Sequence, residues 1–259
     1  MTEAVILERL DAVAVLRLNE SATRNAISPA IRERLEALMP AVMSDPSIRC
    51  VLITGRDGVF CAGGDIRSFA EPQTPAAARV RMGRSHAWIA QLLEAEKPVI
   101  TAVNGPAVGA GLGLALLGDI VMAGTSASFV AGFSLIGLGA DYALGWTLPR
   151  AVGAIRARDI LMTGRQVSAQ EALDMGMVSR LLADDELEAA ALKLAAQLAR
   201  GPTVALGLTK TLVSAGFRSS AREYLQLEGF SQATAFATRD HAEGVRAFLA
   251  KEKPGFEGR

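Results

Sequence analysis

The chain has no excess of charge of either sign and very few cysteines and histidines. Its 259 residues include 27 basic and 27 acidic side chains, two cysteines and two histidines. A balanced charge without a lysine or arginine run argues against nucleic acid or an anionic membrane as the main partner. Cys50 and Cys61 lack metal-ligand spacing and cannot form a disulfide framework, so a reducing compartment is expected.

Signals for export or for a membrane span are also lacking. The first residues lead into an alternating strand pattern without a basic start or a leader-like apolar run, so we expect a cytoplasmic protein. Residues 98–118 carry no charge and are long enough to cross a bilayer. Because Asn104, Gly105 and Pro106 divide this stretch, a buried strand, a loop and a short buried helix explain it better.

What the chain does have is hydrophobic residues in alternating strand and helix patterns. Half of its residues are hydrophobic, which is enough for one sizeable core. Strand and helix patterns alternate up to about residue 180, which predicts an α/β fold with βαβ crossovers. The expected elements are a hairpin at 5–10 and 13–18, helices at 29–43, 73–96 and 110–117, and strands at 50–54, 98–103 and 120–123.

The last third of the chain has only helical patterns. Four segments have a helical period, with no convincing strand between them: 186–200, 203–215, 222–238 and 240–251. Their apolar faces, which include Leu192, Leu194 and Leu198, must be covered by the core or by a neighbouring chain. We therefore divide the protein into an α/β core at 1–182 and a helical C-terminal region at 183–259.

Two loops rich in small residues each follow an apolar, strand-like stretch. The first loop, 60–66, follows the strand pattern at 50–54, and the second, 104–113, follows that at 98–103. Small residues let a ligand approach the backbone, and two N–H groups aimed at one carbonyl oxygen make an oxyanion hole. The second loop does not fit a dinucleotide-binding fingerprint because Leu114 takes the place of its last glycine. Taken alone, its glycines fit close helix packing equally well.

The two loops occur together with other segments in the order and spacing of one protein family. These segments are 97–100, 118–120, 161–165, 168–172 and 240–248. With them, the chain resembles the enoyl-CoA hydratase/isomerase (crotonase) superfamily over nearly its whole length. The resemblance implies a crotonase fold, a spiral of ββα units followed by a helical region that assembles a homotrimer or a dimer of trimers. It also implies an acyl-CoA substrate, with no metal or redox cofactor.

The same resemblance suggests candidate site residues. The backbone N–H groups of Gly64 and Ala110 match the two oxyanion-hole donors, which would hold a thioester oxygen and stabilise an enolate. Arg24 fits a solvated surface charge as well as a ligand contact. Six positions match those that line the coenzyme A and substrate channel of relatives: Arg24, Ala26, Ala62, Asp65, Ile66 and Phe133.

The two glutamates that hydratases of this superfamily use to handle water are missing. One should lie three residues after the second oxyanion donor, where this chain has Gly113. The other should lie where this chain has Phe133. An ordinary two-glutamate hydratase is therefore not expected.

One acidic residue, Asp141, remains near these positions. From the local pattern alone it is a helix N-cap, because it precedes a helical stretch at 143–151. The resemblance favours another role, since several isomerases of the superfamily have their single catalytic carboxylate here, including a ring-opening isomerase of phenylacetate breakdown. An apolar pocket built by Phe133, Ile136 and Leu138 would raise the pKa of Asp141 to suit a base near neutral pH. We therefore expect an enoyl-CoA isomerase with one aspartate base.

Other functions remain open at this stage. A 4-chlorobenzoyl-CoA dehalogenase has its nucleophilic aspartate at the position of Asp141 and its histidine near that of His86, so dehalogenation or thioester hydrolysis is an alternative. A non-catalytic acyl-CoA-binding paralogue, in which Asp141 is only a cap, is another. His86 by itself fits a half-exposed helix position, His241 fits the surface, and Trp88 and Trp146 fit packing positions.

Overall fold

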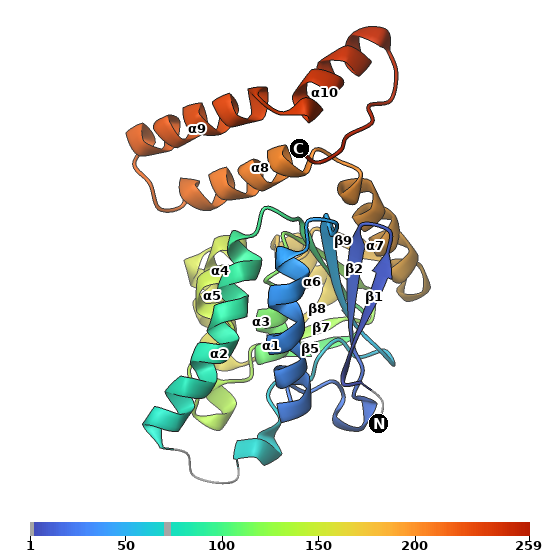
Figure 1. The fold of residues 1–259 in the computed structure, drawn as a ribbon. Helices are drawn as coiled ribbons and strands as arrows, with labels where there is room; N and C mark the ends of the chain where they lie inside the picture. The colour runs from blue at the N-terminus through green and yellow to red at the C-terminus, as the bar shows by residue number, and fades with distance from the viewer. Residues whose placement is uncertain (1–2, 70–73) are drawn as a thin grey trace.

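A six-stranded sheet organises the computed structural model, which describes residues 3–69 and 74–259 (Figure 1). The β1–β2 pair is the predicted antiparallel hairpin, and the other strand pairs of this sheet are parallel. Parallel pairs need crossover connections, which helices supply here. In spatial order the strands are β1 (Val5–Leu10), β2 (Val13–Leu18), β3 (Cys50–Gly55), β4 (Val99–Val103), β6 (Ile120–Gly124) and β9 (Arg180–Leu182).

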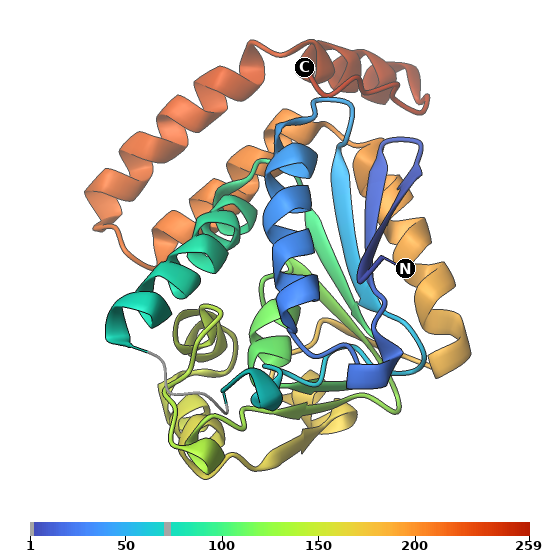
Figure 2. The same cartoon turned by 60° about the horizontal axis from the view of Figure 1, so that its bottom comes forward.

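A second, three-stranded sheet lies below α1 and α3 (Figure 2). Its strands are β5 (Pro106–Val108), β7 (Ser128–Val130) and β8 (Gln166–Ser168), in that spatial order. The sequence patterns do not predict these strands, because three residues are too few to show a period. This sheet is hydrogen-bonded to the second glycine-rich loop. The N–H of Gly109 in that loop donates to the carbonyl oxygen of Val130, the last residue of β7, over 2.8 Å.

One face of the large sheet is covered by helices, and the first two of these helices begin with clear N-cap signals. The hydroxyl of Ser28 accepts a hydrogen bond from the N–H of Ile31 and Pro29 follows it, as predicted, while Thr74 and Pro75 begin the next helix in the same way. A large apolar core lies between these helices and the sheet. The helices are α1 (Pro29–Ser44), α2 (Pro75–Glu94), α3 (Ala110–Ala115), α4 (Leu144–Val152), α5 (Ala154–Thr163) and α6 (Ala169–Asp174).

The opposite face is covered by α7 (Asp184–Ala199), which packs against β2, β3, β4 and β6. Leu187 and Leu194 join strand residues such as Leu52 in a second core cluster, against which Leu192 and Leu198 also pack. The first helix after residue 182 thus covers the sheet. The division of the chain at that residue stays a prediction.

Three further helices form a layer above the core (Figure 1). They are α8 (Thr203–Gly216), α9 (Ala221–Phe236) and α10 (Arg239–Ala250). The last residues of the chain fasten this layer, because the Asp240 carboxylate accepts the N–H groups of Glu257 (2.7 Å) and Gly258 (2.8 Å). Arg49 donates to the carbonyl oxygen of Phe256 over 3.2 Å and so links the tail to the core.

The uncharged stretch at 98–118 contains β4 and α3, as expected, and the short strand β5 lies where a loop was expected. Three short 3₁₀ turns complete the description: Ser21–Thr23, Ile66–Phe69 and Ser134–Ile136. Across residues 3–69 and 74–259, no helix combines the length and the apolar character that a bilayer crossing requires.

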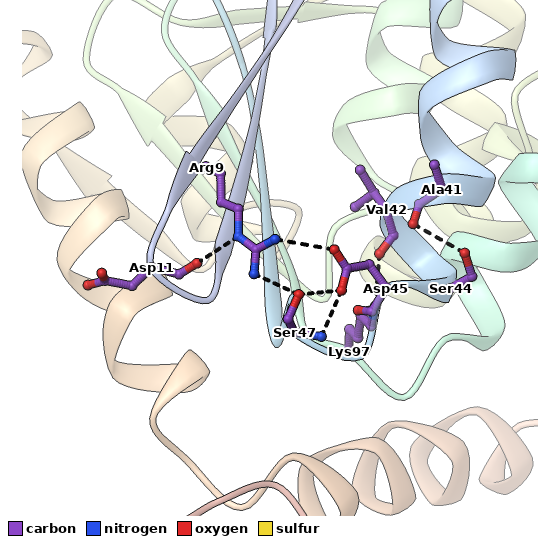
Figure 3. A network of polar contacts seen from close by, with 8 residues as sticks. All are labelled: Arg9, Asp11, Ala41, Val42, Ser44, Asp45, Ser47 and Lys97. Carbon is purple, nitrogen blue, oxygen red and sulfur yellow. Dashed lines mark hydrogen bonds and ion pairs between the residues drawn. The ribbon is translucent and has the colours of Figure 1, made fainter.

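A polar network joins the end of α1 to the start of β4 (Figure 3). The ammonium of Lys97 donates to the carbonyl oxygens of Val42 (2.8 Å) and Asp45 (2.6 Å). Arg9 donates to the Asp45 carboxylate over 3.3 Å and to the Ser47 hydroxyl over 2.6 Å. The last carbonyl groups of a helix have no partner within it, so Lys97 both satisfies them and places a positive charge where the helix dipole favours it.

We expect Lys97→Met to lower the free energy of unfolding by about 1–2 kcal/mol, because both carbonyl oxygens lose their donor. Urea unfolding followed by circular dichroism measures this. Lys193→Met, on the exposed side of α7, is the matched control and should change stability by less than about 0.5 kcal/mol. Equal stabilities of the two variants would contradict a stabilising role for Lys97.

Candidate active site

The first glycine-rich loop lies directly against β5. The N–H of Cys61 donates to the carbonyl oxygen of Pro106 over 3.0 Å, and the N–H of Val108 donates back to Cys61 over 2.9 Å. Gly63 has a φ of +95°, and a Cβ there would lie 2.7 Å from the Val108 carbonyl oxygen. The contact therefore requires glycine at position 63, both for its backbone conformation and for space.

The two predicted oxyanion donors come from these touching loops. A Cβ on Gly63, the neighbour of Gly64, would be 3.9 Å from the nitrogen of Ala110. Ala110 is the first residue of α3, where N–H groups have no intrahelical partner. Within the described part of the chain, neither the Gly64 nor the Ala110 N–H donates a hydrogen bond. Both groups are thus adjacent and unpaired, as an oxyanion hole requires.

A small cavity of about 40 Å³ lies between these loops, α1 and α2. Among the described residues that line it, Asp141 is the one carboxylate. The structure thus brings Gly64, Ala110 and Asp141 to one place, although they are far apart in the sequence. The full lining is Ile27, Arg32, Gly64, Arg81, Met82, Ser85, Ala110, Asp141 and Tyr142.

Asp141 is partly buried, and its Oδ1 atom has no hydrogen-bond partner among the described residues. Burial raises the pKa of its carboxyl group from 3.8 to about 6, and the positive charges of His86 and Arg81 oppose this rise only in part. A carboxyl group with such a pKa is largely ionised at pH 7 and still accepts a proton readily. Proton transfer to and from this carboxyl group is therefore favourable near neutral pH.

The local interpretation of Asp141 as a helix cap is wrong. Helix α4 begins after Ala143, and no side chain caps it. The carbonyl oxygen of Asp141 accepts the N–H of Leu144 over 2.9 Å, but the carboxylate takes no part. Tyr142 and Ala143 both have left-handed φ values, of +50° and +58°, which turn the Asp141 side chain away from the helix start. The carboxylate is therefore available to the cavity.

The positions of the two absent glutamates are filled by other groups. A Cβ on Gly113 would lie 2.5 Å from the Cβ and 2.9 Å from the carbonyl oxygen of Tyr142, and 3.3 Å from the carbonyl oxygen of Asp141. Any side chain at position 113 would therefore collide with the backbone that carries Asp141. Phe133 is buried, and its ring lies 3.7 Å from where a Cβ of Gly109 would be.

Asn25, which the sequence analysis missed, positions the segment that faces the first loop. Its buried side-chain amide donates to the carbonyl oxygens of Val59 (2.8 Å) and Arg56 (3.2 Å). Arg24 and Asn25 both have a φ of +56°, and the N–H of Ala62 donates to Arg24 over 3.1 Å. The one feature of the sequence that could have indicated this role is that asparagine tolerates a left-handed backbone. This property alone does not indicate a functional site.

The predicted channel residues lie beside the cavity but do not line it. Arg24 and Ile66 are exposed, Ala26 is buried, and Ala62 is half-buried. The carboxylate of Asp65 accepts hydrogen bonds from the backbone and the guanidinium of Arg67. The contact of these residues and of Phe133 with coenzyme A stays a prediction.

The three predicted walls of the Asp141 pocket are wrong, because Phe133 is buried but does not line the cavity, and the other two residues face outward. Ile136 is 50% exposed and Leu138 is 49% exposed, and neither lines the cavity. They lie in a 3₁₀ turn and the loop after it, where the chain faces outward. Ile27 and Met82, from segments distant in sequence, supply apolar lining instead.

The histidines and tryptophans lie largely where expected. His86 is exposed on α2 and does not line the cavity. His241 is exposed and packs edge to face on Phe236. Trp88 is fully buried, whereas Trp146 is 39% exposed with the Arg150 guanidinium 3.8 Å above its ring.

Among the described residues, no group of three or more His, Cys, Asp or Glu side chains is placed so that it could hold a metal ion. Cys50 and Cys61 are both buried and unpaired, and burial raises the pKa of each thiol to about 12. Such thiols stay protonated near neutral pH and are poor nucleophiles.

Known proteins share this fold. The Enoyl-CoA hydratase/isomerase family model matches residues 8–259. The chain belongs to this family. It is thus an enzyme of the crotonase superfamily, and the predicted crotonase fold is confirmed. An enoyl-CoA hydratase/isomerase from Cupriavidus metallidurans CH34 has a similar structure, with a TM-score of 0.92, 32% identity and coverage of 100% of this chain and 97% of that one.

Relatives in this family carry both isomerase and hydratase names. The 1,2-epoxyphenylacetyl-CoA isomerase of Escherichia coli K12 is 37% identical, over 100% of both chains. The 2,3-dehydroadipyl-CoA hydratase of the same organism is also 37% identical, over 98% of this chain and 99% of the relative. Overall similarity therefore does not choose between the two activities, and the choice depends on the site itself.

The raised pKa of Asp141 predicts a pH-dependent stability. A carboxyl group with a higher pKa in the folded state binds protons better there, so stability falls as the pH rises from about 4 to 6. Asp141→Asn removes the buried charge and should be about 1–3 kcal/mol more stable than the natural protein at pH 7.5, but nearly equal to it at pH 4. Chemical denaturation at both pH values measures this, and a pH-independent difference would contradict it.

Proposed function

We propose that the protein is an acyl-CoA isomerase that moves a carbon–carbon double bond through an enolate, with Asp141 as its single base. One observation carries the proposal. The cavity at Gly64 and Ala110 contains one carboxylate, and position 113 has no room for a second. This arrangement fits proton transfer within the substrate better than addition of water.

The proposed reaction starts from a 3-enoyl-CoA, in which coenzyme A is part of the substrate. The thioester oxygen accepts hydrogen bonds from the N–H groups of Gly64 and Ala110. The Asp141 carboxylate removes a proton from carbon 2, and the electron pair of that C–H bond moves into the thioester to form a dienolate. The two N–H groups stabilise the negative oxygen. Protonated Asp141 then returns the proton to carbon 4, and the double bond lies between carbons 2 and 3.

A single base is sufficient because nothing is added to the substrate. In hydration, a hydroxyl group and a proton must reach neighbouring carbons, and the superfamily's hydratases use two glutamates to manage this. Here a backbone segment stands over Gly113, and the buried ring of Phe133 occupies the other position. A water molecule would lack both of its carboxylate partners.

The test is incubation of the purified protein with 3-hexenoyl-CoA and, separately, with 2-hexenoyl-CoA, followed by chromatography and mass spectrometry. We expect an isobaric shift of the double bond, and we expect Asp141→Asn to lower kcat by about 10²–10⁴-fold because the base is lost. Asp11→Asn, in the exposed turn between β1 and β2, is the control and should keep full activity.

Two outcomes would contradict the proposal. Addition of water to 2-hexenoyl-CoA would show that the missing glutamates are not needed. Turnover of a halobenzoyl-CoA through a trapped ester on Asp141 would show that this residue is a nucleophile and not a base.

We also propose that the protein assembles as a homotrimer or a dimer of trimers through the layer of α8, α9 and α10. Support comes from the family resemblance and from large apolar side chains that this layer leaves exposed: Val213, Phe217, Leu225, Phe230, Phe236, Phe248 and Leu249. Exposed apolar patches of this kind mark contacts between proteins. Sedimentation equilibrium should give three or six times the mass of the chain, and a monomer at micromolar concentration would contradict the assembly.

A further inference from the structure

The cavity at Gly64 and Ala110 has more positive than negative charge in its described walls. Arg32 from α1 and Arg81 from α2 both line it, and Asp141 is the one carboxylate there. Both arginines are only partly exposed. With Asp141 ionised, the lining residues described carry one positive charge in excess. This lining therefore favours a ligand that carries a negative charge.

The two arginines act on different groups. Burial raises the pKa of Asp141, and the positive charges that oppose this rise are those of His86 and Arg81. The charge of Arg32 acts on the phenol of Tyr142, whose pKa burial raises well above its usual range. That phenol is neutral at pH 7, so it does not balance the charge of Arg32.

The guanidinium group of Arg32 forms no ion pair and no hydrogen bond with residues 3–69 and 74–259. Arg34, two positions further along the same helix, differs because it pairs with Glu3 over 3.0 Å. A guanidinium group has five N–H donors, and a partly buried one normally finds an acceptor. Arg32 therefore brings donors to the cavity that the described part of the chain does not use.

The start of α1 fixes the backbone of Arg32 beside the first glycine-rich loop. The N–H of Arg32 donates to the carbonyl oxygen of Ser28, the N-cap, over 2.9 Å. The N–H of Ile27 donates to the carbonyl oxygen of Gly63 over 2.6 Å, and Ile27 forms a β-bridge with Gly64. Arg32 is the fourth residue of α1, where the positive end of the helix dipole disfavours a cation. Its charge thus does not stabilise the helix, which favours a role toward a ligand.

We propose that Arg32 is a specificity-determining residue that binds a carboxylate at the far end of the acyl group. The preferred substrates are then coenzyme A monothioesters of dicarboxylic acids. The inference rests on the proposed function, because that function places the acyl group in the cavity of Gly64, Ala110 and Asp141. A guanidinium group binds a carboxylate through two parallel N–H···O bonds, which are stronger than bonds between neutral groups.

A phosphate group has the same kind of anionic oxygen atoms, and coenzyme A contains phosphates. The long pantetheine arm of coenzyme A separates these phosphates from the thioester. Arg32, in contrast, lines the same small cavity as the proposed base. An acyl carboxylate is therefore the expected partner, and the test distinguishes it from a phosphate.

The test compares the binding of saturated acyl-CoA probes that need no chemistry. Glutaryl-, adipoyl- and pimeloyl-CoA are each compared with the monocarboxylic probe of the same carbon number, which is pentanoyl-, hexanoyl- or heptanoyl-CoA. Titration calorimetry at pH 7.5 gives each Kd. We expect at least one dicarboxylic probe to bind about tenfold or more tightly than its monocarboxylic counterpart. Arg32→Gln should raise the Kd of that dicarboxylic probe by about 10–100-fold and change that of its counterpart by less than about threefold.

Two further variants sharpen the test. Arg34→Gln lies on the same helix and removes a guanidinium group that pairs with Glu3, so it should keep the preference for the dicarboxylic probe. Arg32→Lys keeps the charge without the planar fork and should retain part of the preference. An unchanged unfolding transition and retained hexanoyl-CoA binding verify the fold of each variant.

Failure of this inference and failure of the proposed base are distinguishable. Asp141→Asn removes a negative charge from the cavity, so it should bind the dicarboxylic probe at least as tightly as the natural protein does. Isomerisation of 3-hexenoyl-CoA is measured separately. A protein that prefers dicarboxylic probes without isomerising 3-hexenoyl-CoA would support the role of Arg32 and contradict only the proposed base.

Three outcomes would overturn the inference. The first is that the natural protein binds no dicarboxylic probe more tightly than its monocarboxylic counterpart. The second is a preference that survives in Arg32→Gln. The third is that Arg32→Gln weakens the binding of both probes by the same factor, which would assign the guanidinium group to a phosphate of coenzyme A.

Discussion

Two backbone segments touch at positions without side chains, and the candidate site exists because of that contact. A Cβ at Gly63 would lie 2.7 Å from the Val108 carbonyl oxygen. Isolated bridges from Cys61 to Ala107 and from Ile27 to Gly64 hold the first loop between β5 and the segment before α1. The parallel sheet and its crossover helices bring these segments, distant in sequence, to one edge. Larger residues at the contact would separate the two N–H groups.

The site contains polar atoms and backbone conformations that are energetically unfavourable. Asp141 Oδ1 has no hydrogen-bond partner among residues 3–69 and 74–259, and Tyr142 and Ala143 have left-handed backbone. Residues held in such conformations cost of order 1–3 kcal/mol each and persist only where the surrounding structure fixes them. Two extensive apolar clusters on the two faces of the sheet supply that support. The concentration of unfavourable features at one cavity agrees with a function there.

Much of the scaffold could be predicted because its signals are local and periodic. Ser28 followed by Pro29 marks the start of α1, and alternation marks the β1–β2 hairpin. The candidate donors Gly64 and Ala110 could be found because the family resemblance rests on two motifs with a fixed spacing. The structure shows in addition that the two loops lie side by side. The sequence of either loop alone does not indicate this contact.

Other features depend on contacts between distant segments and could not be read from local patterns. Asp141 has the sequence context of a helix cap, but two left-handed residues after it direct the side chain elsewhere. Ile136 and Leu138 are apolar yet half-exposed, while Ile27 and Met82 line the cavity from other elements. The role of Asn25 depends on carbonyl groups more than thirty residues away.

The segment that stands over Gly113 also bears on how this site could change over generations. A hydratase-like glutamate at position 113 would displace the backbone that carries Asp141. A single substitution at position 113 would therefore shift the Asp141 carboxylate while it added a second one. Conversion of a site with one carboxylate into a site with two would therefore require coordinated changes in α3 and in the turn before α4.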